Sequence, residues 1–138
     1  MTEPRAPRVL VIDDDRMMLD TARGLLEQAG FEVVTYAGAF NRLNAIVDEA
    51  PDLVLLDVNM PLVPGDALAR LMREDSRLGR VPFAFFSSNG EGDLRRMVRE
   101  AGACGYVSKS DMGFFAAKVR RLIETAKSRP PSPLHAME

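Results

Sequence analysis

Short apolar runs alternate along the chain with longer segments in which apolar residues recur at helical spacing. Runs of this length that are rich in Val, Ile, Leu and Phe are typical of β-strands buried on both faces. They are Val9–Ile12, Phe31–Thr35, Leu53–Leu56, Val81–Phe86 and Cys104–Val107. The periodicity of the intervening segments predicts helices over about residues 16–29, 40–47, 64–72, 92–100 and 111–126.

Capping residues mark several of these helix ends. Asp15 and Asp111 are suited to cap the amino-terminal ends of the first and last helices. Gly30 and Gly102 are suited to end the first and fourth helices, because glycine readily adopts the left-handed conformation that follows a helix. The local signals therefore agree with the hydrophobic pattern.

Five strand–helix units predict an α/β fold with a five-stranded parallel sheet and helices on both faces. Right-handed crossovers bring the carboxyl ends of all strands to one edge, and ligands of open sheets bind in the crevice beyond that edge. Polar residues follow four of the five strands there: Asp13–Asp15, Asp57, Ser87 and Lys109.

These residues predict a site for phosphoryl chemistry. The carboxylates of Asp13, Asp14 and Asp57 would repel one another in one crevice, and oxygen ligands without His or Cys favour Mg²⁺ as the cation that relieves this repulsion. An Asp carboxylate is also a nucleophile toward phosphorus, and Lys109 and Ser87 offer donors for phosphoryl oxygens. We therefore expect Asp57 to accept a phosphoryl group.

Each of these residues has a plainer interpretation when it is taken alone. An Asp after a strand commonly caps a helix or forms a turn, and we expect Asp15 to be a cap. Ser87 alone is typical of a turn, and Lys109 alone is typical of a solvated surface. The hypothesis of a site rests on the needed groups following four strands together.

Composition narrows the class of protein further. The chain has 138 residues, a size typical of one domain, and a net charge of −2. We expect no nucleic-acid binding from so small a net charge, and treat the basic segment 91–129 as a solvated face. Cys104 is the only cysteine, and no apolar run is long enough for a membrane span, so we expect a cytoplasmic protein. His135, the only histidine, lies in a Pro-containing tail outside the predicted fold.

The ordered set of motifs resembles the receiver domain of two-component response regulators. The matching segments are Val9–Asp15, Leu55–Pro61 with Gly65, Pro82–Ser88 and Gly102–Lys109. The resemblance covers roughly residues 8–127 and implies a flavodoxin-like (βα)5 fold with strand order 2-1-3-4-5. We therefore expect a flexible segment over residues 1–7, a receiver domain over 8–127, and a tail or linker over 128–138.

The resemblance also implies roles for the acidic residues. Asp57 would be phosphorylated by a histidine kinase or a phosphotransfer protein. Asp14 and Asp57 would bind Mg²⁺ directly, Asp13 through water, and Asn59 through its backbone carbonyl. The protein would assist its own phosphorylation and dephosphorylation without being an enzyme in the ordinary sense, and it would be a monomer or a weak dimer.

The remaining roles concern the transmission of the signal. Lys109 matches the lysine of the family's site, Ser87 the switch Ser/Thr and Tyr106 the switch aromatic. On phosphorylation Ser87 would move to the phosphoryl group and Tyr106 would turn inward. The face formed by the fourth helix, fifth strand and fifth helix would then change its affinity for a partner.

Two positions depart from the family pattern. Ser110 stands where a proline in a cis peptide is usual, so we expect a trans peptide and a rearranged loop. Ser88 stands where alanine is common. We also expect Phe114 to be exposed beside the fifth helix, on the same side as five arginines: Arg95, Arg96, Arg99, Arg120 and Arg121.

Two other functions are compatible with the sequence. One is a receiver-like interaction module that works without phosphorylation, which the departure at Ser110 keeps open. The other is a small phosphatase that uses Asp13–Asp15 as a nucleophile site, resembling haloacid-dehalogenase enzymes, although Arg16 fits that motif poorly. Phosphorylation of Asp57 with acetyl phosphate separates the first from the switch, and turnover of a phosphate ester tests the second.

Overall fold

The computed structural model describes residues 5–38, 43–59 and 65–128. Strands and helices alternate throughout this part, and the five parallel strands form one sheet in the order β2-β1-β3-β4-β5. The predicted α/β class and strand order are therefore confirmed. The elements are β1 Arg8–Asp13, α1 Arg16–Gln28, β2 Glu32–Ala37, α2 Leu43–Glu49, β3 Leu53–Asp57, α3 Gly65–Glu74, β4 Phe83–Ser87, α4 Glu91–Ala101, β5 Gly105–Ser108 and α5 Phe115–Ser128.

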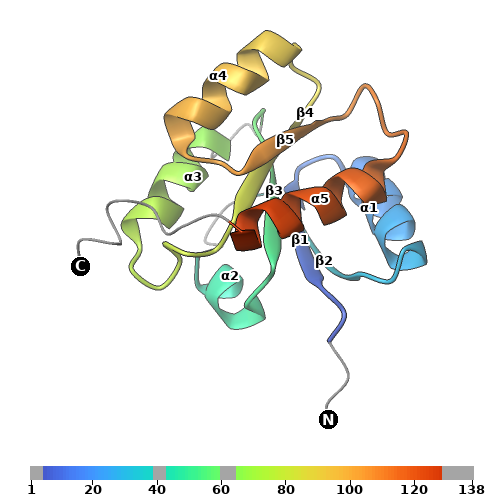
Figure 1. The fold of residues 1–138 in the computed structure, drawn as a ribbon, viewed down its shortest axis with the longest axis horizontal. Coiled ribbons are helices and arrows are strands. Elements are labelled where there is room, and N and C mark those ends of the chain that lie inside the picture. Colours follow the sequence, from blue (N-terminus) through green and yellow to red (C-terminus); the bar gives the residue numbers. More distant parts are fainter. Residues whose placement is uncertain (1–4, 39–42, 60–64, 129–138) are drawn as a thin grey trace.

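Helices cover both faces of the sheet (Figure 1). Helices α1 and α5 pack on one face, and α2, α3 and α4 pack on the other. Alternate residues of each strand point to opposite faces, so Val9 and Val11 join the α1/α5 core while Leu10 and Ile12 join the α2/α3/α4 core. Burial on both sides explains why the central strands consist almost entirely of apolar residues.

Helix ends follow the local chemistry of the sequence. Asp15 caps α1, since its Oδ1 accepts hydrogen bonds from the backbone N–H groups of Met17 and Met18. Gly102 ends α4 in the left-handed conformation, with φ 76°, and its N–H donates to the carbonyl of Val98. Both capping predictions at these helices are confirmed.

Other boundaries differ from those expected. Asp111 does not cap α5, which begins at Phe115, because its carboxylate instead accepts from the N–H of Gly113 within the preceding turn. Cys104 precedes β5 rather than lying in it, although its N–H donates to the carbonyl of Phe83. Ser128 belongs to α5, and the rest of the predicted tail, like the predicted start of the second helix at Phe40, lies outside the described residues.

Within the described residues, no helix is both long enough and apolar enough to span a membrane.

Truncation of a core residue tests this packing. We expect Leu10→Ala to lower the free energy of unfolding by about 2–5 kcal/mol, because Leu10 is 0% exposed and its removal leaves a cavity. Urea unfolding measures the loss. The matched control is Leu71→Ala on α3, where the side chain is 44% exposed and the expected loss is much smaller. Equal losses in the two variants would contradict the assigned core.

Candidate functional site

Four strand ends bring the candidate residues to one edge of the sheet. Asp13, Asp57 and Ser87 are the last residues of β1, β3 and β4, which are neighbours in the sheet. Lys109 directly follows β5, and its N–H donates to the carbonyl of Ser87 at 2.8 Å. The chain order of the motifs thus becomes a spatial cluster through the strand order.

The acidic residues form the centre of the cluster. Carboxylate oxygens of Asp13, Asp14 and Asp57 all lie within 4.8 Å of one another. Asp13 is 0% exposed and Asp57 is 3% exposed, whereas Asp14 is exposed. Buried carboxylates so close together are unfavourable unless cations neutralise them.

Lys109 is the cation that the chain itself supplies. Its Nζ lies 2.6 Å from Oδ2 of Asp13 and 3.3 Å from Oδ1 of Asp57. It also lies 5.2 Å from the centroid of the Phe86 ring, which stacks on Phe115. One ammonium group is therefore shared by two carboxylates, with its shorter contact to Asp13.

The charge of Asp57 remains only partly compensated. Burial is the largest cause, and with the neighbouring Asp13 it raises the pKa of Asp57 from 3.8 to about 6. The N–H of Asn59, which donates to Oδ1 of Asp57 at 3.2 Å, and the ammonium of Lys109 lower the pKa but do not cancel the effect of burial. Asp57 is thus ionised at neutral pH in an environment that disfavours its charge.

The cluster has the donors that a hard divalent cation requires. Oδ2 of Asp13 is buried and has no hydrogen-bond partner among the described residues, although it forms the ion pair with Lys109. Three carboxylates, one of them exposed, provide oxygen ligands and leave an open side for water and phosphoryl oxygens. The residues present therefore fit Mg²⁺, which binds a few carboxylates and keeps several waters.

Ser87 is held by two asparagines. Its hydroxyl oxygen accepts from the N–H of Asn89 at 3.1 Å and from Nδ2 of Asn59 at 3.4 Å. The Asn59 amide also donates to Oδ1 of Asn89 at 2.9 Å. The sequence places Asn59 and Asn89 beside the site and predicts a ligand role only for the backbone carbonyl of Asn59. The spacing of the two residues does not indicate that their side chains meet.

Tyr106 links β5 to the start of α4. Its hydroxyl donates to Oε1 of Glu91 at 2.7 Å, while its half-buried ring packs against the α2/α3/α4 core. Arg95 lies 3.7 Å from the same carboxylate. Glu91 was not among the predicted residues, and its position in the first turn of α4 was the one available signal.

The loop after Lys109 has the predicted trans peptide before Ser110. Asp111 accepts from the Gly113 N–H and from Nζ of Lys118, which holds the turn without a proline. Phe114 is 85% exposed, as expected, and has a φ of 59°, which is uncommon for an aromatic residue.

The expectation that all five arginines share the α4–β5–α5 side is wrong for Arg120. Its guanidinium lies over the Phe31 ring, 4.7 Å from the centroid, and donates to the carbonyl of Ala29. Arg120 therefore faces the end of α1. It does so because an aromatic face and a free helix carbonyl together satisfy the guanidinium there.

Comparison with known proteins identifies the family. Residues 9–120 match the response regulator receiver domain, and the chain belongs to this family of two-component signal-transduction proteins. The polar-differentiation response regulator DivK of Brucella anthropi is 29% identical over 121 residues, which cover 87% of this chain and 93% of DivK. A solved structure of a sensor protein from Polaromonas sp. JS666 is 26% identical to this chain, with a TM-score of 0.78. The match covers 89% of this chain and 99% of that one.

A third relative is longer than this chain. The DNA-binding dual master transcriptional regulator RpaA of Synechocystis is 29% identical over 131 residues, which cover 94% of this chain. The matched region spans 54% of RpaA, so this chain corresponds to about half of that protein. The DNA binding in the name of RpaA is a property of that protein and is not assigned to this chain.

The raised pKa of Asp57 predicts a pH-dependent cost to stability. Without divalent cations, the contribution of Asp57 to wild-type stability falls as the pH rises from about 4 past 6, because the folded state binds this proton more tightly than the unfolded state does. Asp57→Asn removes this titration, so its free energy of unfolding relative to wild type should increase by on the order of 2 kcal/mol between pH 4.5 and pH 7.5.

Urea unfolding in EDTA at both pH values measures this difference. Asp20→Asn is the matched control, because Asp20 is exposed on α1. A stability difference between Asp57→Asn and wild type that does not change with pH would show that the carboxylate is not destabilised in the fold.

Proposed function

We propose that this chain is a phosphoacceptor switch that receives a phosphoryl group on Asp57 from a histidine kinase or a phosphotransfer protein. The observation that carries the proposal is the pairing of a buried, destabilised carboxylate with a shared lysine at the open edge of the sheet. Addition of a phosphoryl group changes the charge and hydrogen bonding of Asp57. The site is thus suited to register that change.

In the proposed transfer, a carboxylate oxygen of Asp57 attacks phosphorus and the bond from phosphorus to the donor nitrogen breaks. Oδ1 is held by the Asn59 N–H and by Lys109, which orients the carboxylate and leaves Oδ2 outside these two contacts. Lys109 then donates to a phosphoryl oxygen from a position it already occupies. The preorganised ammonium stabilises charge that develops on the phosphoryl group.

Asp13, Asp14 and Asp57, with the backbone carbonyl of Asn59, would hold Mg²⁺ beside the acceptor. When bound, the ion supplies positive charge to the carboxylates and phosphoryl oxygens. The exposed position of Asp14 leaves it free to turn toward the ion, whereas Asp13 is constrained by Lys109 and by the Asp15 N–H. This difference supports Asp14 as a direct ligand and Asp13 as a ligand through water.

Ser87 and Tyr106 are the proposed transmitting residues. The Ser87 oxygen accepts from Asn59 and Asn89, so its O–H can donate to a phosphoryl oxygen on Asp57. That charge-assisted bond is stronger than the two amide contacts and would draw the Ser87 side chain away from them. Because Asn89 and Gly90 lead into α4, movement of Ser87 displaces the start of that helix. Loss of the bond from Tyr106 to Glu91 would then let the ring turn inward and alter the α4–β5–α5 face.

The test is phosphorylation by acetyl phosphate, followed by mass spectrometry of the intact protein. With Mg²⁺ the wild type should gain the mass of one phosphoryl group, because Asp57 is the nucleophile, and Asp57→Asn should gain none. Omission of Mg²⁺ should reduce the gain strongly. The matched control is Asp15→Asn, because Asp15 caps α1 and should leave phosphorylation at the wild-type level.

The same measurement distinguishes the proposal from the interaction module that works without phosphorylation. Absence of any gain in the wild type with Mg²⁺ would favour that module. A gain that persists in Asp57→Asn would place the acceptor elsewhere.

The limits of the domain at residues 8 and 127 also stay a prediction.

A further inference from the structure

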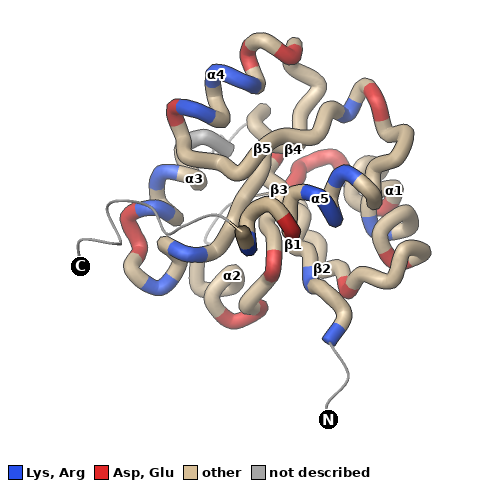
Figure 2. Tube along the Cα trace, viewed as in Figure 1, with Lys and Arg blue, Asp and Glu red and all other residues tan. Residues whose placement is uncertain are grey.

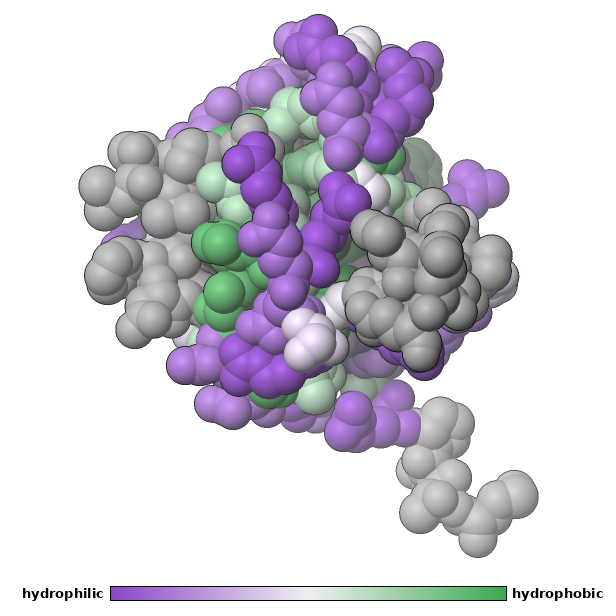
Figure 3. Space-filling model, turned by 90° about the vertical axis from the view of Figure 1, so that its left-hand side faces the viewer, coloured by the Kyte–Doolittle hydropathy of each residue, from purple (hydrophilic) through white to green (hydrophobic). Residues whose placement is uncertain are grey.

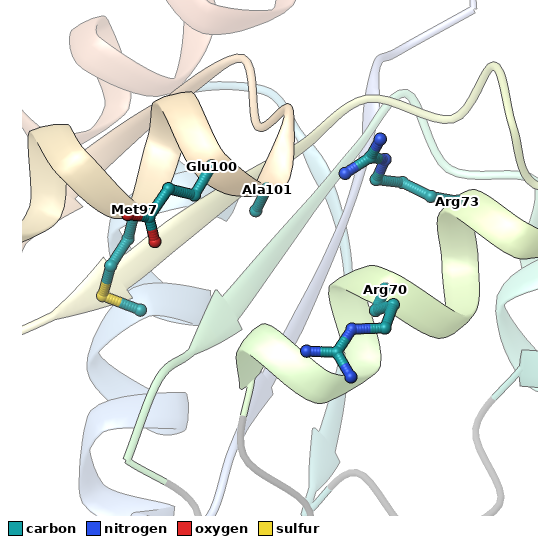
Figure 4. Close-up of a pocket in the computed structure, with 5 residues that line it drawn as sticks. All are labelled: Arg70, Arg73, Met97, Glu100 and Ala101. Carbon is teal, nitrogen blue, oxygen red and sulfur yellow. The ribbon is translucent and has the colours of Figure 1, made fainter. Parts of the chain in front are cut away.

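A cleft lies between α3 and α4, away from the acidic site. It is lined by Arg70 and Arg73 from α3 and by Met97, Glu100 and Ala101 from α4 (Figure 4). These residues lie in the second halves of both helices. Since the helices run antiparallel to the strands, the second halves lie toward the edge of the sheet opposite to Asp57.

The two arginines of the cleft have no polar partner among the described residues. Arg70 and Arg73 make no ion pair or hydrogen bond with any residue that the structure describes. Arg73 packs against Gly102, where a Cβ atom would lie 3.8 Å from its Nε, so its guanidinium is positioned by the end of α4. Glu100 lies on the facing wall but forms no ion pair with either arginine within the described part of the chain.

The cleft has an apolar part beside its charged part. Met97 and Ala101 are half-buried and pack against the α2/α3/α4 core, so they offer an apolar wall next to the guanidinium groups. Figure 3 shows this side of the molecule, with hydrophobic surface visible between bands of hydrophilic side chains. Basic residues recur along both α3 and α4 (Figure 2). The surface therefore favours a ligand that is both anionic and apolar.

The volume of the cleft limits the size of what enters it. At about 150 Å³ it holds the equivalent of about five waters, well below the roughly 300–1,000 Å³ of pockets that bind drug-sized molecules. One or two side chains fill it. Each guanidinium group can bind a carboxylate in bidentate geometry, which favours an acidic peptide over a neutral one.

We propose that the α3–α4 cleft binds an acidic segment of a partner protein. Acidic side chains of that segment pair with Arg70 and with Arg73, whose guanidinium groups lie apart in Figure 4, and a neighbouring apolar side chain packs on Met97 and Ala101. Glu100 sets the direction of the segment by repelling its carboxylate toward α3. The cleft and the acidic site share no residue, so this binding does not require Asp57 to be phosphorylated.

The test is titration of the isotopically labelled full chain, in metal-free buffer, with a short peptide that alternates glutamate and leucine. The amide signals of Met97, Ala101 and Gly102 should shift and saturate, and a peptide with lysine in place of glutamate should bind about tenfold more weakly or not at all. Arg70→Glu with Arg73→Glu should reverse this preference. Arg121→Glu is the matched control, because Arg121 is exposed on α5.

Several outcomes would overturn the proposal. They are equal affinity for the acidic and lysine peptides, unchanged binding by the double variant, or no shift at these signals with millimolar acidic peptide. Equal saturation by inorganic phosphate would make the occupant a free anion instead. Signals that move on dilution of the protein, or on truncation after Ser128, would assign the cleft to a second copy or to residues 129–138. The double variant must retain the wild-type urea midpoint, and if it does not, Arg70→Gln with Arg73→Gln replaces it.

Discussion

The site depends on a carboxylate held at the end of a strand that is buried on both faces. Leu53–Leu56 place Asp57 where water cannot solvate its charge fully, and Asp13 ends the adjacent strand in the same way. One ammonium group, that of Lys109, is shared between them. The fold therefore maintains an excess of negative charge at this edge of the sheet, and the proposed Mg²⁺ and phosphoryl group would act on that excess.

The surrounding contacts connect this edge to α4. Ser87 accepts hydrogen bonds from Asn59 and from Asn89, and Asn89 lies two positions before the start of α4. Tyr106 donates a hydrogen bond to Glu91 in the first turn of that helix. Each of these single hydrogen bonds is worth only about 1 kcal/mol, so the proposed phosphoryl group on Asp57 would be able to replace them.

Much of this arrangement could be predicted from the sequence, because it depends on chain order. The apolar run before Asp57 and the regular strand–helix spacing predict the sheet and the edge where Asp13, Ser87 and Lys109 meet. Side-chain pairings between distant segments could not be predicted in the same way. The contact of Tyr106 with Glu91 and the turn of Arg120 toward Phe31 depend on rotamers and on free carbonyls that only the packed structure defines. Asp111 was mistaken for a cap because a turn and a helix start use the same residue types.

The role of uncompensated buried charge is tested most directly by the pKa of the Asp57 side chain, measured by carbon-detected NMR with and without Mg²⁺. We predict that the pKa of Asp57 is raised from 3.8 to about 6 in the metal-free protein. Addition of Mg²⁺ should lower this pKa strongly, because the cation favours the charged carboxylate. A metal-free pKa near 3.8 that Mg²⁺ leaves unchanged would contradict the claim that uncompensated buried charge organises the site.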